Sequence, residues 1–392
     1  MQEALRFAAG EPSDRRMKLR VAQINCIIDE QDREPAELLQ AWSTMALVAE
    51  AAAGAGAEVH VVQSSRTPRS YRAGGVDYRF VPEVRLSTGF GPGLMPWRLA
   101  AEIRRIRPDV VHFHGLETPV HLRAASYCSA PVLVQDHASR PSRRAKWARR
   151  WSLGRVTACA FTSAEQAEPF ARAGQLPTHV RVFDIPESSS RFTPGDRQEA
   201  RAQAGVFGDP ALLWVGHLDT NKDPLTILRA VLLALEELPE LQLWCAFGHT
   251  DLLPEVQALL QQHPELAGHV HLLGQVPHAT VETLCRACDM FVLGSHREGS
   301  GYALLEALAC GLVPVVSDIP SFRSLTGAGA VGSLAAPGDV AGFAAGIIAQ
   351  ARALGSGSRA AVLAYFDAHL SPAALGRRLV RAYETMAGAA KG

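Results

Sequence analysis

The chain has 392 residues, of which 47% are hydrophobic and 20% charged, a composition typical of a globular protein with room for two domains. Lysine plus arginine and aspartate plus glutamate each number 39, so the zero net charge gives no support to nucleic-acid binding. Seven scattered cysteines, an odd number, favour reduced thiols over a disulfide framework.

The first residues lack the pattern of an export signal. Residues 1–16 are polar without a hydrophobic centre, and we expect a disordered leader there. No apolar run in the chain reaches the length of a membrane span. We therefore expect a cytoplasmic protein, with contact to the inner face of a membrane as an open alternative.

Strands and helices alternate through the first half of the chain, which is typical of a doubly wound α/β domain. Short apolar runs predict the strands, and helical periodicity with start signals predicts the helices. The predicted strands are Leu19–Asn25, Val59–Gln63, Tyr78–Val81, Val110–His114, Val132–Gln135, Cys159–Thr162 and Val180–Phe183, and the predicted helices are Pro35–Gly54 and Met95–Arg107.

The first predicted strand is not followed by G-x-G-x-x-G, so this domain carries no ordinary dinucleotide fingerprint. A glycine cluster at Gly89, Gly91 and Gly93 could cradle a phosphate. It follows no strong strand and precedes Pro96, which favours a flexible connection.

Histidines lie at two places in this domain. His137 follows the strand Val132–Gln135 at its carboxyl end, where open α/β sheets place ligands, so it is the better site candidate. His112 and His114 alternate along their strand and share one face, and we favour a structural role for both.

The segment 140–155 is strongly basic, with six arginines, one lysine, and Trp147 and Trp151 one helical turn apart. As a helix it would carry an aromatic stripe beside a cationic face. We favour a solvated surface helix that packs through its tryptophans. A peripheral contact with a membrane or with an acidic acceptor is the open alternative.

A polar stretch from Glu187 to Arg201, rich in serine, proline and glycine, predicts a linker between two domains. Cys285 and Cys288 beyond it form a CxxC without a second pair, inside a helical pattern, which favours core residues. The predicted strands after the linker are Leu212–Val215, Leu241–Phe247, His269–Leu273, Phe291–Leu293 and Val313–Val316; the predicted helices are Pro224–Leu238, Leu252–Gln262, Tyr302–Cys310 and Ser371–Ala387.

Two loops of this second half have features that bind anions. Lys222 precedes a helix for which Asp223 is the expected N-cap and Pro224 lies in the first turn. The glycine-flanked loop 295–301 precedes a second helix start, whose free backbone N–H groups and positive dipole end would attract a phosphate.

Two carboxylates, Glu298 and Glu306, bracket that helix start eight positions apart. Glu306 is the only charged residue between Tyr302 and Cys310, and an ionised carboxylate on an apolar helix is costly without donors such as sugar hydroxyls. A dipole-compensating Glu306 with a solvated Glu298 is the structural alternative.

The run from Ser295 to Ser317 resembles the signature of the retaining nucleotide-sugar glycosyltransferases of family 4, with its E-x7-E pair. The matching segments are Glu298-Gly299-Ser300-Gly301, Leu305-Glu306-Ala307, Ala309-Cys310-Gly311 and Pro314-Val315-Val316. The resemblance implies an α/β protein of the GT-B fold, in which two Rossmann-like doubly wound domains face one another across a cleft. Its domains would be an acceptor domain at 17–187, a donor domain at 188–370, and a helix in 371–392 that crosses back to the first domain.

The resemblance also implies roles for single residues. His137 and Glu298 would be catalytic, with His137 beside the donor sugar near the reacting carbon and Glu298 on the sugar hydroxyls. Glu306 would bind the ribose. The remaining donor-binding positions would be His217, Lys222, Val276, Gly299, Ser300, Gly301, Tyr302 and Ala303.

Three positions depart from the family pattern. Ile27–Gln31 stands where many members have a glycine pair, and Glu187-Ser188 stands where an Asn-Gly turn is usual. His217 replaces an arginine on the diphosphate, and its imidazole, mostly neutral near pH 7, would make a weaker phosphate contact.

These features predict a retaining glycosyltransferase that moves a sugar from a nucleotide diphosphate to a hydroxyl acceptor, such as a glycan, a lipid-linked sugar or a small molecule. No D-x-D pair occurs, so we expect no metal and no cofactor besides the donor substrate. The alternatives are an epimerase or phosphorylase on the same fold, and a non-catalytic binder of nucleotide-sugars.

Overall fold

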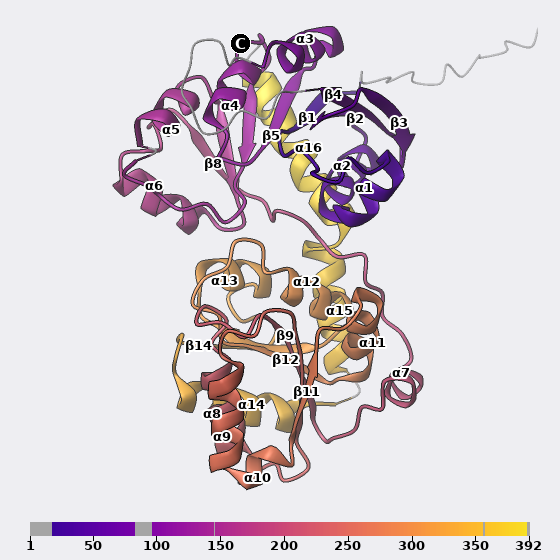
Figure 1. Cartoon of the computed structure of the whole chain (residues 1–392), viewed down its shortest axis with the longest axis vertical. Coiled ribbons are helices and arrows are strands. Elements are labelled where there is room, and N and C mark those ends of the chain that lie inside the picture. The colour runs from indigo at the N-terminus through magenta and orange to yellow at the C-terminus, as the bar shows by residue number, and fades with distance from the viewer. Residues whose placement is uncertain (1–17, 83–95, 145, 356, 390–392) are drawn as a thin grey trace, which may run out of the picture.

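The computed structural model describes residues 18–82, 96–144, 146–355 and 357–389, which form two α/β lobes, one above the other in Figure 1. The expected leader 1–16 and the glycine cluster 89–93 lie outside the described residues. The fold class predicted from the alternation of strands and helices is confirmed: each lobe is built on a parallel sheet.

The first lobe contains an eight-stranded sheet in the order β3-β4-β2-β1-β5-β6-β7-β8. All neighbouring strands are parallel except β3 and β4, which form a hairpin through two glycines with positive φ, Gly74 and Gly75. The strands are β1 Arg20–Asn25, β2 Glu58–Ser65, β3 Arg69–Ala73, β4 Val76–Pro82, β5 Val110–His114, β6 Val132–Gln135, β7 Ala158–Phe161 and β8 Arg181–Asp184.

Helices cover both faces of this sheet, because its strands carry apolar side chains on both sides and bury two separate cores. The single helix predicted at 35–54 is two helices, because Trp42 leaves the helical conformation with φ −111° and ψ 53°. The helices of this lobe are α1 Pro35–Ala41, α2 Ser43–Gly54, α3 Trp97–Ile106, α4 Pro119–Ala125, α5 Lys146–Leu153, the 3-10 helix η1 Ala164–Ala167, and α6 Glu168–Arg172.

The predicted packing of α5 is wrong. Its tryptophans point outward, with Trp147 78% and Trp151 44% exposed, while Arg149 is buried. Arg149 donates hydrogen bonds to the Arg140 carbonyl and to the Gln175 side chain, and it pairs with Glu117. These partners offset the cost of burying the guanidinium, so α5 packs through Arg149, Ser152 and Leu153 instead of through the aromatic stripe.

The linker prediction is also partly wrong. Residues 187–190 are buried between the lobes, and the chain from Arg197 is helical. Asp196 caps this helix, α7 Arg197–Ala204, by accepting from the backbone N–H of Glu199 at 2.9 Å. The serines of the segment lie inside the molecule because the two lobes close over them.

The second lobe contains a six-stranded parallel sheet in the order β11-β10-β9-β12-β13-β14, packed into one apolar core. Cys285 and Cys288 are buried in it, as predicted. The strands are β9 Ala211–Gly216, β10 Gln242–Phe247, β11 Val270–Gly274, β12 Met290–Leu293, β13 Val313–Ser317 and β14 Ser333–Ala335; the helices are α8 Pro224–Ala234, α9 Leu253–Gln262, α10 Pro264–Ala267, α11 His278–Ala287, α12 Tyr302–Ala309, α13 Pro320–Thr326, α14 Val340–Ala353 and α15 Ser358–His369.

Each sheet has one place where the strand order reverses. In the first lobe it lies between β1 and β5, and in the second between β9 and β12. Loops that leave such neighbours diverge to opposite faces of the sheet and open a crevice at the carboxyl ends of the strands. The topology therefore marks two candidate ligand positions, one in each lobe.

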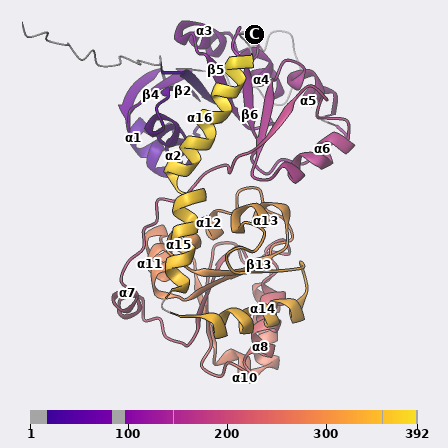
Figure 2. The ribbon, with the colours of Figure 1, turned by 180° about the vertical axis from the view of Figure 1, so that it is seen from behind.

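The last helix, α16 Pro372–Ala389, returns from the second lobe and lies along the first, as seen from behind in Figure 2. It packs against α2, and Leu375, Leu379 and Tyr383 are buried in the same core as the first sheet. A Cβ at Gly376 would overlap the carbonyl oxygen of Ala51, so the two helices touch through a glycine.

We expect Gly376→Ala to lower the free energy of unfolding by about 1–3 kcal/mol, because the added methyl forces α16 away from α2. Chemical denaturation monitored by circular dichroism measures the change. Gly388→Ala is the matched control, since nothing lies within 4 Å of a Cβ at that position of the same helix. Equal stability of the two variants would contradict the packing described.

Candidate functional site

The two loops with anion-binding features follow β9 and β12, at the reversal point of the second sheet. Asp223 caps α8 as predicted: its φ is 44° and its carboxylate accepts from the backbone N–H of Thr226 at 3.2 Å. Asn221 ties the two loops together by accepting from the His296 backbone N–H and donating to the Arg297 carbonyl. This frame places the neighbouring Lys222 side chain against the loop after β12.

Lys222 and Glu298 form an ion pair at the centre of the site, between Nζ and Oε1. The Ser295 hydroxyl donates to the same carboxylate oxygen at 2.7 Å. Both charged side chains are largely buried, so solvent screens this pair less than a surface pair. An ammonium group is therefore held in place beside the start of α12.

Arg297 of the same loop is influenced by a positive charge of the first lobe. Burial and the positive charge of Arg140 in the first lobe lower the pKa of Arg297, while Glu298 opposes that shift. Like charges held close together favour an anion between them.

The loop 295–301 ends at Gly301, whose φ of 64° begins α12. A Cβ there would lie 2.9 Å from Leu325 Cδ1, so both the backbone conformation and the space favour glycine. Tyr302 and Ala303 follow in the first turn, where their backbone N–H groups have no partner within the helix. These are the groups expected to bind a phosphate.

Glu306 lies one turn further along α12. Its Oε1 is 2.7 Å from His278 Nε2. Burial raises the pKa of the Glu306 carboxyl, and the contact with His278 opposes the shift. Burial therefore disfavours the ionised carboxylate more than the contact with His278 stabilises it.

Two predicted donor residues stand apart from the ion pair. His217 follows β9, is exposed, and accepts at Nδ1 from the His249 backbone N–H at 3.3 Å. Val276 lies in the turn between β11 and α11 and packs at the edge of the core. The structure shows no contact of either residue with Lys222 or Glu298 among the described residues.

His137 comes from the other lobe, just after β6. Its Nδ1 lies 3.0 Å from Oε2 of Glu187, and the Ser300 hydroxyl donates to that same oxygen. The structure thus brings His137 and Ser300 together through Glu187, a residue that we had assigned to the linker.

The two strand histidines differ in their surroundings. His112 Nδ1 lies 2.8 Å from the Tyr383 hydroxyl of α16, and burial lowers the pKa of His112 to about 3, so it is a neutral structural residue as predicted. His114 Nδ1 lies 3.2 Å from His137 Nε2, and burial lowers its pKa as well. His114 therefore belongs to the surroundings of the site.

A cavity of about 620 Å³ opens beside His137, at the reversal point of the first sheet. Tyr302 of the second lobe forms part of its wall. The other lining residues are Asn25, Cys26, Ile27, Ala41, Trp42, Thr44, Met45, Val48, His114, Gly115, Glu117, Thr118 and Ser139. Its size and its mixture of apolar walls with a few polar groups are typical of a small-molecule site.

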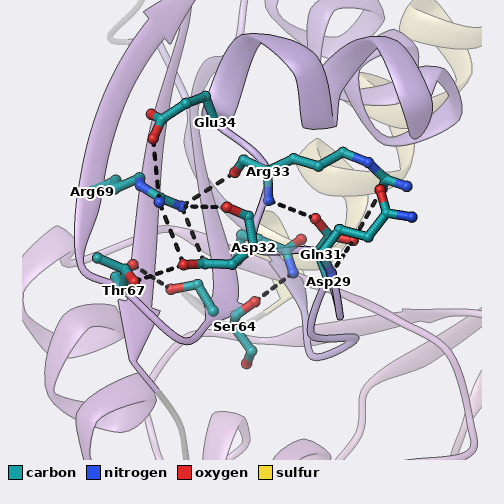
Figure 3. Close-up of polar contacts among 10 residues, drawn as sticks. Asp29, Gln31, Asp32, Arg33, Glu34, Ser64, Thr67 and Arg69 are labelled. Carbon is teal, nitrogen blue, oxygen red and sulfur yellow. Dashed lines mark hydrogen bonds and ion pairs between the residues drawn. The ribbon is translucent and has the colours of Figure 1, made fainter.

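The loop after β1, which lacks a glycine pair, is fixed by charged side chains (Figure 3). Asp29 accepts from the backbone N–H of Arg33 at 2.8 Å and from its guanidinium at 2.9 Å. Arg69 of β3 donates to the carboxylate and carbonyl of Asp32 and pairs with Glu34. These contacts hold one rim of the cavity in a defined position.

Four residues of the site were missed from the sequence: Glu187, Ser295, His278 and Gln166. Glu187 and His278 stand beside motifs, but their partners are remote in the chain. Ser295 contacts Glu298 only three positions later, within the loop motif itself. Gln166 of η1 donates to the Glu298 carbonyl at 2.9 Å across the lobes, while its Oε1 accepts from the Ser163 backbone N–H. The only signal in the sequence was the capping box Ser163–Gln166.

Comparison with known proteins places both lobes in one family. Residues 196–351 match the family described as "Glycosyl transferases group 1", and residues 41–184 match "Glycosyltransferase Family 4". The chain is 31% identical to a phosphatidyl-myo-inositol mannosyltransferase of Mycolicibacterium smegmatis over 301 residues, 72% of either chain. It is 30% identical to a D-inositol 3-phosphate glycosyltransferase of Geodermatophilus obscurus over 282 residues, which are 64% of this chain and 62% of that protein.

Solved structures share the fold. Sucrose-phosphate synthase of Thermosynechococcus elongatus superposes with a TM-score of 0.65 at 19% identity, covering 95% of this chain and 100% of that one. Anabaena HepE in complex with UDP and glucose gives 0.62 at 16% identity, covering 94% and 100%. The GT-B arrangement expected from the sequence is thereby confirmed.

We expect Glu306→Gln to raise the midpoint of thermal unfolding by about 2 °C at pH 7.5. Folding raises the pKa of the Glu306 carboxyl above its unfolded value of 4.5, so its ionisation lowers the stability of the folded protein as the pH rises above 4.5. The amide of glutamine does not ionise, which removes this cost, and its oxygen still accepts a hydrogen bond from His278. Differential scanning calorimetry from pH 4 to 8 should show the gain fading toward pH 4. Glu255→Gln, on the exposed face of α9, is the control; a lower midpoint for Glu306→Gln would contradict the assignment.

Proposed function

Because this chain belongs to the family 4 glycosyltransferases of group 1, we propose that it moves a sugar from a nucleotide diphosphate to a hydroxyl acceptor with retention of anomeric configuration and without a metal ion. The observation that carries the proposal is the buried Lys222–Glu298 pair beside the start of α12. It places a cation, free backbone N–H groups and a carboxylate at one end of the second sheet.

The donor diphosphate would bind between Lys222 and the first turn of α12. Its negative charge would also relieve the repulsion between Arg297 and Arg140. HepE, whose fold this chain shares, is described in complex with UDP and glucose, which supports a nucleotide-sugar as the donor class. The base contact at Val276 and a contact of His217 with phosphate remain part of this proposal.

The sugar would lie between the lobes, with Glu298 on its hydroxyls, His137 on the other side and Glu306 on the ribose. The acceptor would enter the cavity beside His137. The acceptor oxygen forms a bond to the anomeric carbon while the bond from that carbon to the diphosphate oxygen breaks. A leaving phosphate oxygen on the same face takes the acceptor proton, and the cations stabilise the departing diphosphate.

Transfer without a metal ion agrees with the residues around the diphosphate position. The sequence contains no D-x-D pair, and the groups there that neutralise an anion are a lysine, arginines and a helix start. An epimerase would act on the nucleotide-sugar without a hydroxyl acceptor, and a phosphorylase would instead transfer a sugar from a glycoside to inorganic phosphate. A non-catalytic binder would take up the nucleotide-sugar without turnover.

We further propose that a surface on α4 and α5, made of Trp147, Trp151, Tyr127, Arg123 and Arg155, contacts an anionic membrane. The Arg123 guanidinium lies 5.3 Å from the rings of both Tyr127 and Trp151, and all three aromatic residues are exposed. No aspartate or glutamate occurs from 137 to 164. Exposed tryptophans beside arginines suit the interface of anionic lipids. No helix in the described parts of the chain could span a bilayer.

A thermal-shift and turnover panel with UDP-, GDP- and ADP-sugars tests the donor site. A nucleotide at about 100 times its dissociation constant should add roughly 2.7 kcal/mol to the stability of the wild type. Lys222→Ala should weaken that binding by about 10- to 100-fold, because a charged hydrogen bond is lost. Lys18→Ala, at an exposed position outside the site, should bind like the wild type.

The same panel decides between the candidate activities. Transfer predicts nucleotide diphosphate release that depends on an added hydroxyl acceptor. Conversion of the donor alone would indicate an epimerase, and binding without turnover a non-catalytic protein. If no nucleotide stabilises the wild type, the donor site as proposed does not exist.

Vesicle sedimentation tests the membrane surface. The protein should bind vesicles that contain phosphatidylglycerol and not those of phosphatidylcholine alone, and Trp147→Ala with Trp151→Ala should weaken binding by about tenfold. Trp97→Ala, which removes an exposed tryptophan from α3, is the control. Equal binding of all three proteins would rule this surface out.

A further inference from the structure

Glu187 stands where the family usually has an Asn-Gly turn, and its side chain lies between the lobes. We infer that Glu187 is a positioning residue that holds His137 in one tautomer and completes this contact only when the donor loop closes onto the first lobe. The inference rests on the proposed transfer reaction. It adds Glu187 to the two carboxylates, Glu298 and Glu306, already placed in the site.

The contacts of Glu187 come from both lobes. Its side chain is 5% exposed, and its Oε2 is 3.0 Å from His137 Nδ1 of the first lobe. The same oxygen accepts the Ser300 hydroxyl of the second lobe. A buried carboxylate is costly without donors, and here one donor is supplied from each side of the cleft. Separating the lobes removes the Ser300 donor, so the closed arrangement is the one that satisfies Glu187.

The backbone allows this approach because residue 299 is glycine. A Cβ at Gly299 would lie 2.5 Å from Cβ of Ala138 and 2.7 Å from Oε1 of Glu187. Any side chain would hold the donor loop away from the first lobe and break the Ser300 contact. Gln166 reinforces the approach by donating to the carbonyl of Glu298 at 2.9 Å. The hydrogen bond from Ser300 to Glu187 therefore forms only when the loop 295–301 lies against the first lobe.

The contact also decides which nitrogen of His137 carries the proton. A carboxylate only accepts hydrogen bonds, so His137 donates through Nδ1–H, and its Nε2 in the neutral ring holds a lone pair. His114 Nδ1 lies 3.2 Å from Nε2, in position to donate to that lone pair. A sugar hydroxyl that enters the cleft can replace His114 as the donor. Glu187 thus makes His137 an acceptor for the substrate.

The tautomer can be measured without turnover. Protein labelled with ¹⁵N-histidine, at pH 8, should show His137 protonated at Nδ1 only, with the resonance assigned by its loss in His137→Asn. In Glu187→Ala, the proton should move mainly to Nε2. A wild-type His137 protonated at Nε2 or at both nitrogens, or a tautomer unchanged in Glu187→Ala, would overturn the inference.

Kinetics test the coupling to closure. Glu187→Gln should lower kcat by about 10- to 100-fold, since misplacement of a reacting geometry costs that much, while the donor KM changes by less than about threefold. The matched control is Glu282→Gln, because Glu282 also holds the linker, accepting from the Thr193 backbone N–H at 3.0 Å, but contacts neither His137 nor Ser300. The control should keep the wild-type kcat.

The double variant Glu187→Gln, Ser300→Ala should lose less activity than the product of the two single losses, because both changes break one contact. Multiplicative losses, or a Glu187→Gln enzyme with the kcat of the wild type, would overturn the coupling. If the wild type itself transfers no sugar, the proposed function fails, and the histidine tautomer still decides whether Glu187 positions His137.

Discussion

The close approach of the loop 295–301 to the first lobe is the constraint on which the site depends. At Gly299 the backbone passes so near Ala138 and Glu187 that a methyl group would not fit. This contact places the start of α12 opposite His137 and lets Tyr302 form a wall of the cavity in the other lobe. Residues 187–190 at the start of the linker are buried between the lobes, and α16 returns to pack on α2 (Figure 2).

Charged side chains in the cleft have partners from within the protein. Lys222 is neutralised by Glu298, and Glu187 is satisfied by donors from His137 and Ser300. Glu306 contacts His278, and burial raises the pKa of its carboxyl. Each of these groups is held in position by a neighbouring side chain.

Several structural features follow from the local sequence. Alternating apolar runs and helix start signals predict two parallel sheets, because a buried strand and an amphipathic helix each need a partner layer. The cap at Asp223 and the glycine at 301 are set by rules that act within a few residues, and the structure has both. The family resemblance rests on the same local segment, 295–317. Family membership and fold class could therefore be read without coordinates.

The tertiary structure decided what depends on residues far apart in the chain. Glu187 meets Ser300 across 113 positions and Gln166 meets Glu298 across 132, distances at which a single sequence carries no pairing signal. The outward turn of Trp147 and Trp151 depends on Arg149 finding Glu117 and Gln175 in neighbouring segments, which outweighs the apolar stripe. The local sequence pattern determined where the strands and helices lie and which residues follow the strand ends. The packing of the two lobes determined which of those residues face one another, because burial and hydrogen-bond satisfaction are properties of the whole fold.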